Sequence, residues 1–414
     1  MEEKLLGKNL DLFDPGYLAN PYPTLKKLRE ERPVYWDESV KGWVVTRHAD
    51  VKNILGRAND FSNERIRPFL DYMRKHGMND LAEVGESVTK WVVFTDQPLH
   101  TKMRMVLNQA FLPAIPSMEG FVRDTVDKLL KNLESREEFN LLDDFAIPLP
   151  TAVIVNMFGL PPEDAVMIKH WSDELAAFIG GARLDPLRAE RSTEAIRGMR
   201  DYFFKVVADR KINRGTDVIS RMIDYSEKTP DPFTDEEYVQ TCTILIFAGH
   251  ETTTDLIGTG IYNLLRHPDQ LAMVRDDPTI IDKAIEELLR YDNPAACLVR
   301  VSKVDAEIGG QQIKNGDRLF CMILSTNRDP SVFAEPDNLD VTRKSRGSLH
   351  FGYGLHLCLG APLARLEGRI AIPEFLRRFG DIQLTEEAPT WREAYVVRGV
   401  SSLVLRHPSA VAAE

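Results

Sequence analysis

The 414-residue sequence contains little cysteine and no cysteine pattern of a disulfide framework. Its four cysteines are Cys242, Cys297, Cys321 and Cys358, and no two of them form a CxxC pair. Sparse cysteines without regular spacing are typical of proteins in a reducing compartment. We therefore expect a cytoplasmic location.

Long apolar runs are also missing. The longest uncharged stretch, residues 145–162, is interrupted by Pro148, Pro150 and Asn156, and it is shorter than the roughly 20 apolar residues that a membrane helix needs. The first eight residues contain no apolar core of a secretory signal. No Gly/Ser-rich linker or repeat divides the chain. The sequence therefore predicts no membrane anchor and a single domain over residues 1–414.

Basic residues are in the minority. There are 52 Lys and Arg against 63 Asp and Glu, so the net charge is -11. Because nucleic-acid binding needs a concentrated basic face, nucleic acid is not an expected partner. The hydrophobic fraction of 43% and the charged fraction of 28% are ordinary for a globular protein.

Helical periodicity dominates the middle of the chain. Apolar residues recur at intervals of three and four over roughly residues 97–290, which predicts mostly helix. Near the N-terminus the pattern predicts a helix at 20–32, a hairpin of segments 33–36 and 42–46, and a helix from residue 49. Strand-like segments return at 298–301, 318–322 and 396–405. The expected fold is mainly α with a small β-rich lobe, and its strands are confined to the two chain ends.

One predicted helix is unusually long. Thr234 and Glu237 have the spacing of a capping box, and no strong breaker follows until His267 and Pro268. The helix should contain about 32 residues and extend roughly 48 Å. A second helix is delimited by Asp277 as the cap, by Pro278 at its first position and by residues 293–294 after its end.

The strongest chemical signal is the segment 351–360, FGYGLHLCLG, in which Cys358 lies among glycines directly before a predicted helix. Backbone N–H groups and the positive end of a helix stabilise a thiolate there. Gly352 and Gly360 permit a tight turn and close approach to a flat ring, while Phe351 can shield the sulfur. A lone cysteine is more often an inert buried residue. The ten-residue pattern instead favours an anionic metal ligand, and it resembles the haem-binding loop of cytochromes P450.

The resemblance extends from the Asn20 helix to the terminal strands and implies a soluble bacterial P450 of the type that takes electrons from a ferredoxin or flavodoxin. It implies haem b, with Cys358 as axial ligand, between the long helix and the helix after the cysteine loop. The implied reaction uses dioxygen and two electrons, supplied through an NAD(P)H-dependent reductase, to insert one oxygen atom into a small, mainly apolar substrate. A peroxide-driven peroxygenase and a non-catalytic haem-binding or sensor protein are the alternatives.

A second motif lies midway along the long helix, in residues 248–252. The small side chains of Ala248 and Gly249 would let a flat cofactor or a substrate approach the helix. The neighbouring His and Glu suggest a zinc protease, but Thr254 stands where that motif needs a second histidine. In the P450 resemblance Glu251 and Thr252 are the acid and alcohol that supply protons during dioxygen activation, which disfavours the peroxygenase alternative.

The third motif is Glu287 and Arg290, which an i,i+3 spacing places on one helix face. Alone it would be an ordinary surface pair. The resemblance implies that the pair is buried behind the haem loop and joined by a third residue, usually Arg or His. Asn338 occupies that position here; its amide can still form hydrogen bonds, but the charge balance differs.

The resemblance also assigns residues around the cofactor and the substrate. The expected partners of the haem propionates are His100, Arg104, Arg300 and His356. The expected substrate pocket contains Leu245, Ala248, Ala296, Val299 and Val397, with segments 61–91 and 176–185 covering its entrance. A cationic face beside the cysteine loop should receive an acidic ferredoxin through Arg343, Lys344, Arg346 and Arg365.

Overall fold

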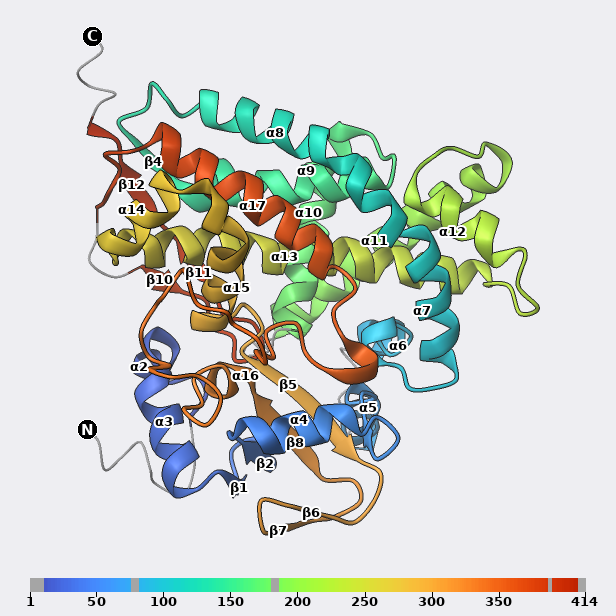
Figure 1. Cartoon of the computed structure of the whole chain (residues 1–414). Coiled ribbons are helices and arrows are strands. Elements are labelled where there is room, and N and C mark those ends of the chain that lie inside the picture. Colours follow the sequence, from blue (N-terminus) through green and yellow to red (C-terminus); the bar gives the residue numbers. More distant parts are fainter. Residues whose placement is uncertain (1–10, 76–81, 180–185, 386–388, 409–414) are drawn as a thin grey trace. The chain divides into compact units, whose positions relative to one another are not determined.

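A computed structural model describes residues 11–75, 82–179, 186–385 and 389–408, and helices dominate it (Figure 1). The chain divides into two compact units, which we describe one at a time. Unit 1 comprises Met1–Phe61, Val122–Leu149 and Thr252–Glu414, and unit 2 comprises Ser62–Phe121 and Pro150–Glu251. Among the described residues, no helix is both long enough and apolar enough to span a bilayer.

Unit 1 contains the main sheet. Its strand order is β1-β2-β8-β5-β3. The first two strands form the predicted antiparallel hairpin, β2 pairs with β8 in parallel, and β8 pairs with β5 antiparallel. The strands are β1 (Val34–Asp37), β2 (Gly42–Val45), β3 (Phe61–Ser62), β5 (Cys297–Ser302) and β8 (Arg318–Met322).

Alternation along these strands builds an apolar cluster on each face of the sheet, because successive side chains of a strand point to opposite faces. Val44 and Phe320 belong to one cluster. Their neighbours Val45, Leu319 and Cys321 belong to the other.

The remaining strands of unit 1 are short. Strand β6 pairs with β7, β10 pairs with β11, and a three-stranded sheet has the order β4-β12-β9. They comprise β4 (Glu138–Asn140), β6 (Ala306–Ile308), β7 (Gln311–Ile313), β9 (Gln383–Leu384), β10 (Thr390–Trp391), β11 (Val400–Ser402) and β12 (Val404–Arg406).

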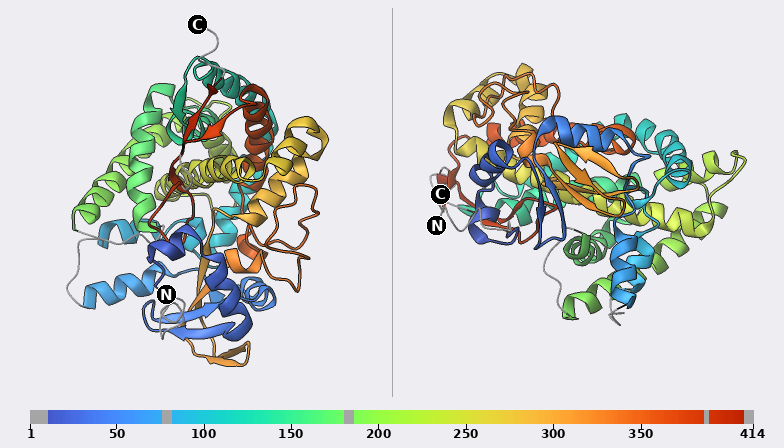
Figure 2. Two further views of the ribbon diagram at one scale, coloured as in Figure 1. Left: turned by 90° about the vertical axis from the view of Figure 1, so that its left-hand side faces the viewer. Right: turned by 90° about the horizontal axis from the view of Figure 1, so that it is seen from below.

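Helices α14 (Pro268–Asp276) and α15 (Ile281–Tyr291) lie beside α17 (Ala361–Arg378), the helix that follows the cysteine loop (Figure 2). A methyl group at Gly368 of α17 would lie 3.1 Å from Ile285 and 3.2 Å from Leu256, so this helix contact is close. The other helical elements of unit 1 are α2 (Pro15–Ala19), α3 (Tyr22–Glu31), α4 (His48–Gly56), α16 (Ile323–Thr326), a π-turn (Leu142–Ala146), and 3-10 turns at Pro278–Ile280 and Gly354–His356.

Unit 2 is built from helices. Helices α10 (Ala165–Ile179) and α11 (Pro186–Ile212) pack closely. A methyl group at Gly198 of α11 would lie 2.8 Å from the ring of Trp171 on α10. The others are α5 (Ile66–Lys75), α6 (Ala82–Val88), α7 (Leu99–Ala110), α12 (Val218–Ser226), and 3-10 turns Val92–Phe94, Leu112–Met118 and Pro162–Asp164.

Three helices continue from one unit into the other: α8 (Glu119–Lys131), α9 (Pro148–Met157) and α13 (Asp235–Leu265). Helix α13 confirms the prediction of a very long helix. The Thr234 N–H donates to Glu237 Oε2 at 2.7 Å, and the Glu237 N–H donates to Thr234 Oγ1 at 3.2 Å. This reciprocal pair is the predicted capping box.

Two predictions of local structure were wrong. Strands are not confined to the chain ends, because β4 lies in the middle of the sequence and pairs with β12 over Asn140 and Val404. Its pairing depends on a partner far along the chain, which local patterning cannot reveal. The segment 61–91, expected as an entrance loop, contains α5 and α6. Residues 76–81 of this segment, and 180–185 of the second entrance segment, lie outside the described residues.

Candidate active site

The cysteine loop of unit 1 is a tight turn built on glycine. Gly352 and Gly354 have φ angles of 77° and 75°, a region that L side chains rarely adopt. A methyl group at Gly354 would lie 2.8 Å from the carbonyl oxygen of Leu55 on α4, so this glycine is also needed for close approach. The Cys358 N–H donates to the Phe351 carbonyl at 3.0 Å. The turn thus places Cys358 two residues before Gly360, the N-cap of α17.

Cys358 differs from the other cysteines in its exposure. Cys242, Cys297 and Cys321 are buried, whereas Cys358 is exposed. Burial raises the pKa of Cys321 to about 12 and also raises that of Cys242, so neither thiol ionises at neutral pH. An exposed thiol before a helix start can become the thiolate that a metal requires. The donor set of this loop therefore fits the iron of a haem.

Gly360 has no conformational need for glycine. Its φ is -77°, which any residue adopts. A methyl group there would lie 3.9 Å from the Cys358 sulfur, an ordinary contact distance. Because Gly360 has no side chain, residue 360 does not cover the Cys358 sulfur on this side.

Phe351 and Arg365 connect the cysteine loop to α15 and α17 through a cation–π contact and an ion pair. The Arg365 guanidinium lies 4.5 Å from the centre of the Phe351 ring. The same guanidinium donates to Glu286 Oε1 at 2.5 Å and to Oε2 at 3.0 Å. His350 Nε2 lies 3.2 Å from Glu286 Oε2. Burial alone would raise the pKa of Glu286, but the bonds from His350 and Arg365 outweigh it and hold this pKa at about 2.

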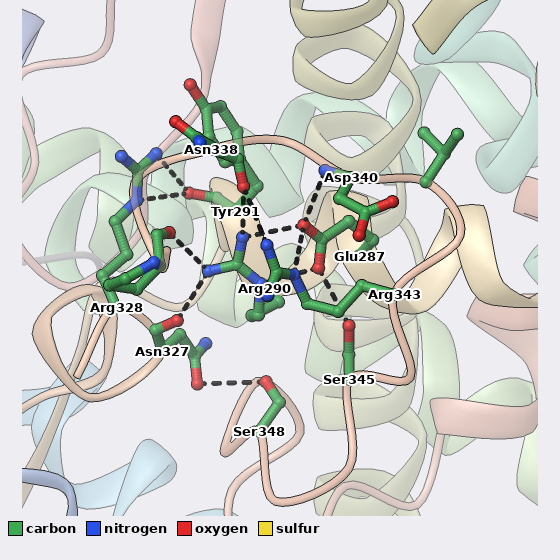
Figure 3. A network of polar contacts seen from close by, with 12 residues as sticks. Glu287, Arg290, Tyr291, Asn327, Arg328, Asn338, Asp340, Arg343, Ser345 and Ser348 are labelled. Atoms are coloured by element: carbon green, nitrogen blue, oxygen red, sulfur yellow. Dashed lines mark hydrogen bonds and ion pairs between the residues drawn. The ribbon is translucent and has the colours of Figure 1, made fainter. Parts of the chain in front are cut away.

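The Glu287 and Arg290 pair is buried, and both side chains are 0% exposed (Figure 3). Arg290 Nε donates to Glu287 Oε2 at 2.6 Å, and Nη2 donates to Oε1 at 2.8 Å. Arg290 Nη1 also donates to the carbonyl oxygens of Asn327 and Pro336 at 2.9 and 2.8 Å. The pair connects α15 to the segment that leads into the cysteine loop.

The third partner of this pair is not the side chain of Asn338. Its backbone carbonyl accepts from Arg290 Nη2 at 3.1 Å, while its side-chain amide donates to Glu335. Arg343 instead supplies the second cation, because its Nε donates to Glu287 Oε1 at 3.1 Å. Arg343 is therefore a structural residue and not the free docking cation that we predicted. The remaining docking candidates Lys344 and Arg346 are exposed, whereas Arg365 is engaged with Glu286.

In unit 2, the middle of α13 presents one exposed alanine. Ala248 is exposed, while Leu245 is 8% exposed and counts among the buried side chains. A methyl group at Gly249 would lie 2.9 Å from the side chain of Ile154. Gly249 is thus needed for packing against α9, and its predicted role in admitting a flat cofactor has no support from this contact.

Glu251 belongs to a polar cluster in unit 2. Its Oε1 lies 3.3 Å from Lys169 Nζ and 3.1 Å from His250 Nε2. Lys169 also forms an ion pair with Asp173, four residues further along α10. Burial raises the pKa of Asp173, Lys169 opposes this shift, and the nearby charge of Glu251 adds to it. The glutamate is 5% exposed, so its carboxylate is held in a largely dry, charged environment.

The part of α13 that belongs to unit 1 starts at Thr252, where three consecutive threonines differ in exposure. Thr252 is exposed, whereas Thr253 and Thr254 are 3% and 1% exposed. Thr254 Oγ1 donates to the Ala146 carbonyl at 3.0 Å. A rotation of about 100° per residue separates the three side chains, and only the first of them faces open space.

The four predicted propionate partners lie in both units. In unit 2, His100 and Arg104 are four residues apart on α7. Burial, and then the charge of Arg104, lower the pKa of His100 to about 4, so His100 is neutral at neutral pH and would offer a neutral N–H. In unit 1, Arg300 is buried on β5 and its Nη1 donates to the Val299 carbonyl at 3.0 Å. His356 lies in the 3-10 turn of the cysteine loop.

Three predicted pocket residues belong to unit 1. Ala296 and Val299 are buried in the apolar cluster on one face of the main sheet. Val397 is half-buried and forms an isolated β-bridge with Ala295. Their contact with a substrate stays a prediction.

Sequence reasoning missed Lys169 and Asp173 beside Glu251, and it misassigned Arg343. Lys169 and Asp173 are four residues apart, a signal for a shared helix face, but no local pattern connects Lys169 with Glu251, which is 82 positions away. The one sequence signal for the structural role of Arg343 was its position a few residues after Asn338.

Comparison with known proteins assigns the family. A family model described as "Cytochrome P450" matches residues 25–392. The chain therefore belongs to the cytochrome P450 family, whose bacterial members include biosynthetic and hydroxylating monooxygenases. It is a haem-dependent oxidoreductase of this family, and family membership implies thiolate ligation by cysteine.

Individual relatives cover nearly the whole chain. The biotin biosynthesis cytochrome P450 of Bacillus subtilis (strain 168) is 34% identical over 391 residues, which are 94% of this chain and 96% of that protein. The vitamin D(3) 25-hydroxylase of Pseudonocardia autotrophica is 31% identical over 95% of each chain. Among solved structures, CalO2 has a TM-score of 0.88 at 30% identity and covers 97% of this chain and 99% of its own.

Proposed function

We propose that this protein is a monooxygenase that receives two electrons from a separate redox protein and inserts one atom of dioxygen into a small, mainly apolar organic molecule. Cys358 would hold the iron, and bound haem b would supply the centre at which dioxygen is activated. His100, Arg104, Arg300 and His356 are the proposed partners of its propionates. The fold assignment, the loop geometry and the exposure of Cys358 support this proposal.

The observation that carries the proposal beyond haem binding is the exposed residue Thr252 directly after the buried residue Glu251. Dioxygen activation consumes protons, and a peroxide-driven enzyme or a sensor has no need for a dedicated supply. In our account Glu251 passes protons inward, and Thr252 Oγ1 orients the last donor at the reaction centre. Lys169 keeps a cation beside the Glu251 carboxylate, with its Nζ 3.3 Å from Oε1.

The redox partner is proposed to be a small acidic ferredoxin or flavodoxin with its NAD(P)H-dependent reductase. Lys344 and Arg346 are exposed in the segment before the cysteine loop. Positive charge on a chain of net charge -11 would orient an acidic partner toward this face. A cytoplasmic location is part of the same proposal, because reduced partners and unpaired cysteines belong to a reducing compartment.

The substrate class is proposed as apolar and small. Leu245, Ala296 and Val299 bring only aliphatic side chains to the predicted pocket. Related proteins are described as acting on or binding chemically different molecules, including vitamin D(3) and an acyl carrier protein ligated with hexadec-9Z-enoic acid. Both molecules contain long hydrocarbon portions, which agrees with an apolar pocket.

Replacement of Thr252 tests the proposed proton delivery. Thr252→Ala should retain haem and the carbon monoxide spectrum, because this side chain neither ligates iron nor packs in the core. NAD(P)H consumption should continue while product per NAD(P)H falls and hydrogen peroxide accumulates. Thr252→Ser, which keeps the hydroxyl, should restore coupling.

Thr253→Ala is the matched control, since the neighbouring hydroxyl is buried. Tight coupling in Thr252→Ala together with uncoupling in Thr253→Ala would mean that the wrong hydroxyl had been assigned. A rate supported by hydrogen peroxide alone that equals the NAD(P)H-supported rate would favour the peroxygenase instead.

A further inference from the structure

The cluster around Glu251 has the composition of a metal site. One ligand atom from each of Asp173, His250 and Glu251 can be chosen so that all three atoms lie within 4.8 Å of one another. His250 and Glu251 come from α13, and Asp173 comes from α10. All three belong to unit 2.

His250 is oriented as a metal-binding histidine would be. Its side chain is 0% exposed, and its Nδ1 lies 2.9 Å from the carbonyl oxygen of Ile246. A carbonyl only accepts hydrogen bonds, so Nδ1 carries a proton, and Nε2 is the ring nitrogen that faces the carboxylates. Metal-ligating histidines are commonly held in this way. Among the described residues, Nε2 has no hydrogen-bond partner.

Nε2 faces the two carboxylates, an arrangement that needs a proton or another cation between the nitrogen and the oxygens. Nε2 lies only 3.1 Å from Glu251 Oε1. Lys169 marks the position of a cation, because its ammonium group forms ion pairs with both Glu251 and Asp173. The Lys169 ammonium group contacts the carboxylates, whereas a metal ion would also engage the imidazole nitrogen.

We propose that Asp173, His250 and Glu251 form an inhibitory zinc site, in which Zn²⁺ displaces the ammonium group of Lys169. Imidazole nitrogen with carboxylate oxygen is a ligand set that zinc accepts and that magnesium and calcium do not favour. Tetrahedral ligands at the usual zinc bond lengths are roughly 3.4 Å apart. The His250 and Glu251 atoms already approach this spacing. Only Asp173 must move, and its side chain is 50% exposed.

The inhibitory effect rests on the function proposed above. A zinc ion on Glu251 would occupy the carboxylate that is assigned to proton delivery, so turnover with dioxygen should fall. Haem and its cysteine ligand belong to other residues, and the carbon monoxide spectrum should not change. Binding itself is independent of the proposed reaction and can be measured separately.

The experiment is titration of the haem-loaded protein with zinc chloride by isothermal calorimetry in a non-chelating buffer. We expect one zinc ion per chain. Asp173→Asn and His250→Gln should each weaken binding at least about tenfold, the lower end of what even outer-shell changes cost. Lys169→Met should tighten binding about fivefold, because it removes the competing cation. Asp201→Asn, an exposed carboxylate on α11, is the matched control and should leave the affinity unchanged.

Opposite effects of Lys169→Met and Asp173→Asn distinguish this site from nonspecific zinc binding at surface acids. The proposal is overturned if the wild type binds no zinc, or if Asp173→Asn, which replaces an exposed side chain and should fold normally, binds zinc like the wild type. If zinc binds with the expected variant pattern but NAD(P)H-driven product formation is unaffected, the zinc site stands and the proton-delivery role of Glu251 is wrong.

Discussion

Removal of the Glu287 carboxylate should severely impair folding and haem incorporation. Glu287 accepts five hydrogen bonds: two from Arg290, one each from the side chains of Arg343 and Ser345, and one from the Asp340 N–H. Glu287→Ala would leave the fully buried Arg290 charged and without its anion. Loss of one member of a buried pair costs roughly 3–5 kcal/mol, a large part of the about 5–15 kcal/mol by which proteins are stable.

The measurement is the free energy of unfolding in urea, together with haem content after identical expression. Glu287→Gln separates charge from shape, because its amide oxygen can still accept some of the same bonds, and its loss should be intermediate. Asp282→Ala is a matched control on the same helix. Asp282 and its partner Arg369 are 74% and 42% exposed, so the loss should be roughly 1 kcal/mol or less.

The reasoning is refuted if Glu287→Ala unfolds within about 1 kcal/mol of the wild type and carries a full complement of haem. Such a result would mean that the pair contributes no more than an exposed one, despite its burial. Equal losses in Asp282→Ala and Glu287→Ala would contradict the account in the same way.

Two further predictions concern the partner face and a buried acid. Charge reversal in Lys344→Glu and Arg346→Glu should slow ferredoxin-supported reduction at low salt, with a smaller difference at high salt; equal rates at every ionic strength would remove the docking argument. Glu367 is 0% exposed, neither of its oxygens has a hydrogen-bond partner among the described residues, and burial raises its pKa well above the usual value. Its protonated form therefore favours folding at low pH, and this contribution is lost as pH rises above the unfolded pKa of about 4.3, by up to about 1.4 kcal/mol per pH unit. The stability gained by Glu367→Leu should accordingly grow between pH 5 and pH 8, and a gain that is constant with pH would contradict this.

Local signals predicted the helices and the cysteine loop well. The capping box of Thr234 and Glu237 forms as expected, and α13 ends two residues before His267. Gly352, which was expected to permit a tight turn, has a positive φ angle, as has Gly354, whereas Gly360 has a φ of -77°. These features depend on interactions between residues that are close in sequence, so a single sequence is enough to predict them.

Contacts between segments that are far apart in the chain could not be predicted from the sequence. Arg343, a second cationic partner of Glu287, is 56 positions away, and an i,i+3 pattern cannot tell whether a pair is buried. A methyl group at Gly249 would meet Ile154 of another helix, a packing contact that local sequence does not reveal. The cluster of Asp173, His250 and Glu251 likewise exists only once α10 and α13 are folded together.

The central claim is that Cys358 is the iron ligand, and the carbon monoxide spectrum of the reduced protein tests it most directly. Thiolate ligation should give a strongly red-shifted Soret band in the wild type. Cys297→Ser and Cys321→Ser, which replace buried cysteines, should keep this band, whereas Cys358→Ser should lose it. A red-shifted band that persists in Cys358→Ser and disappears in either of the other two variants would contradict the account.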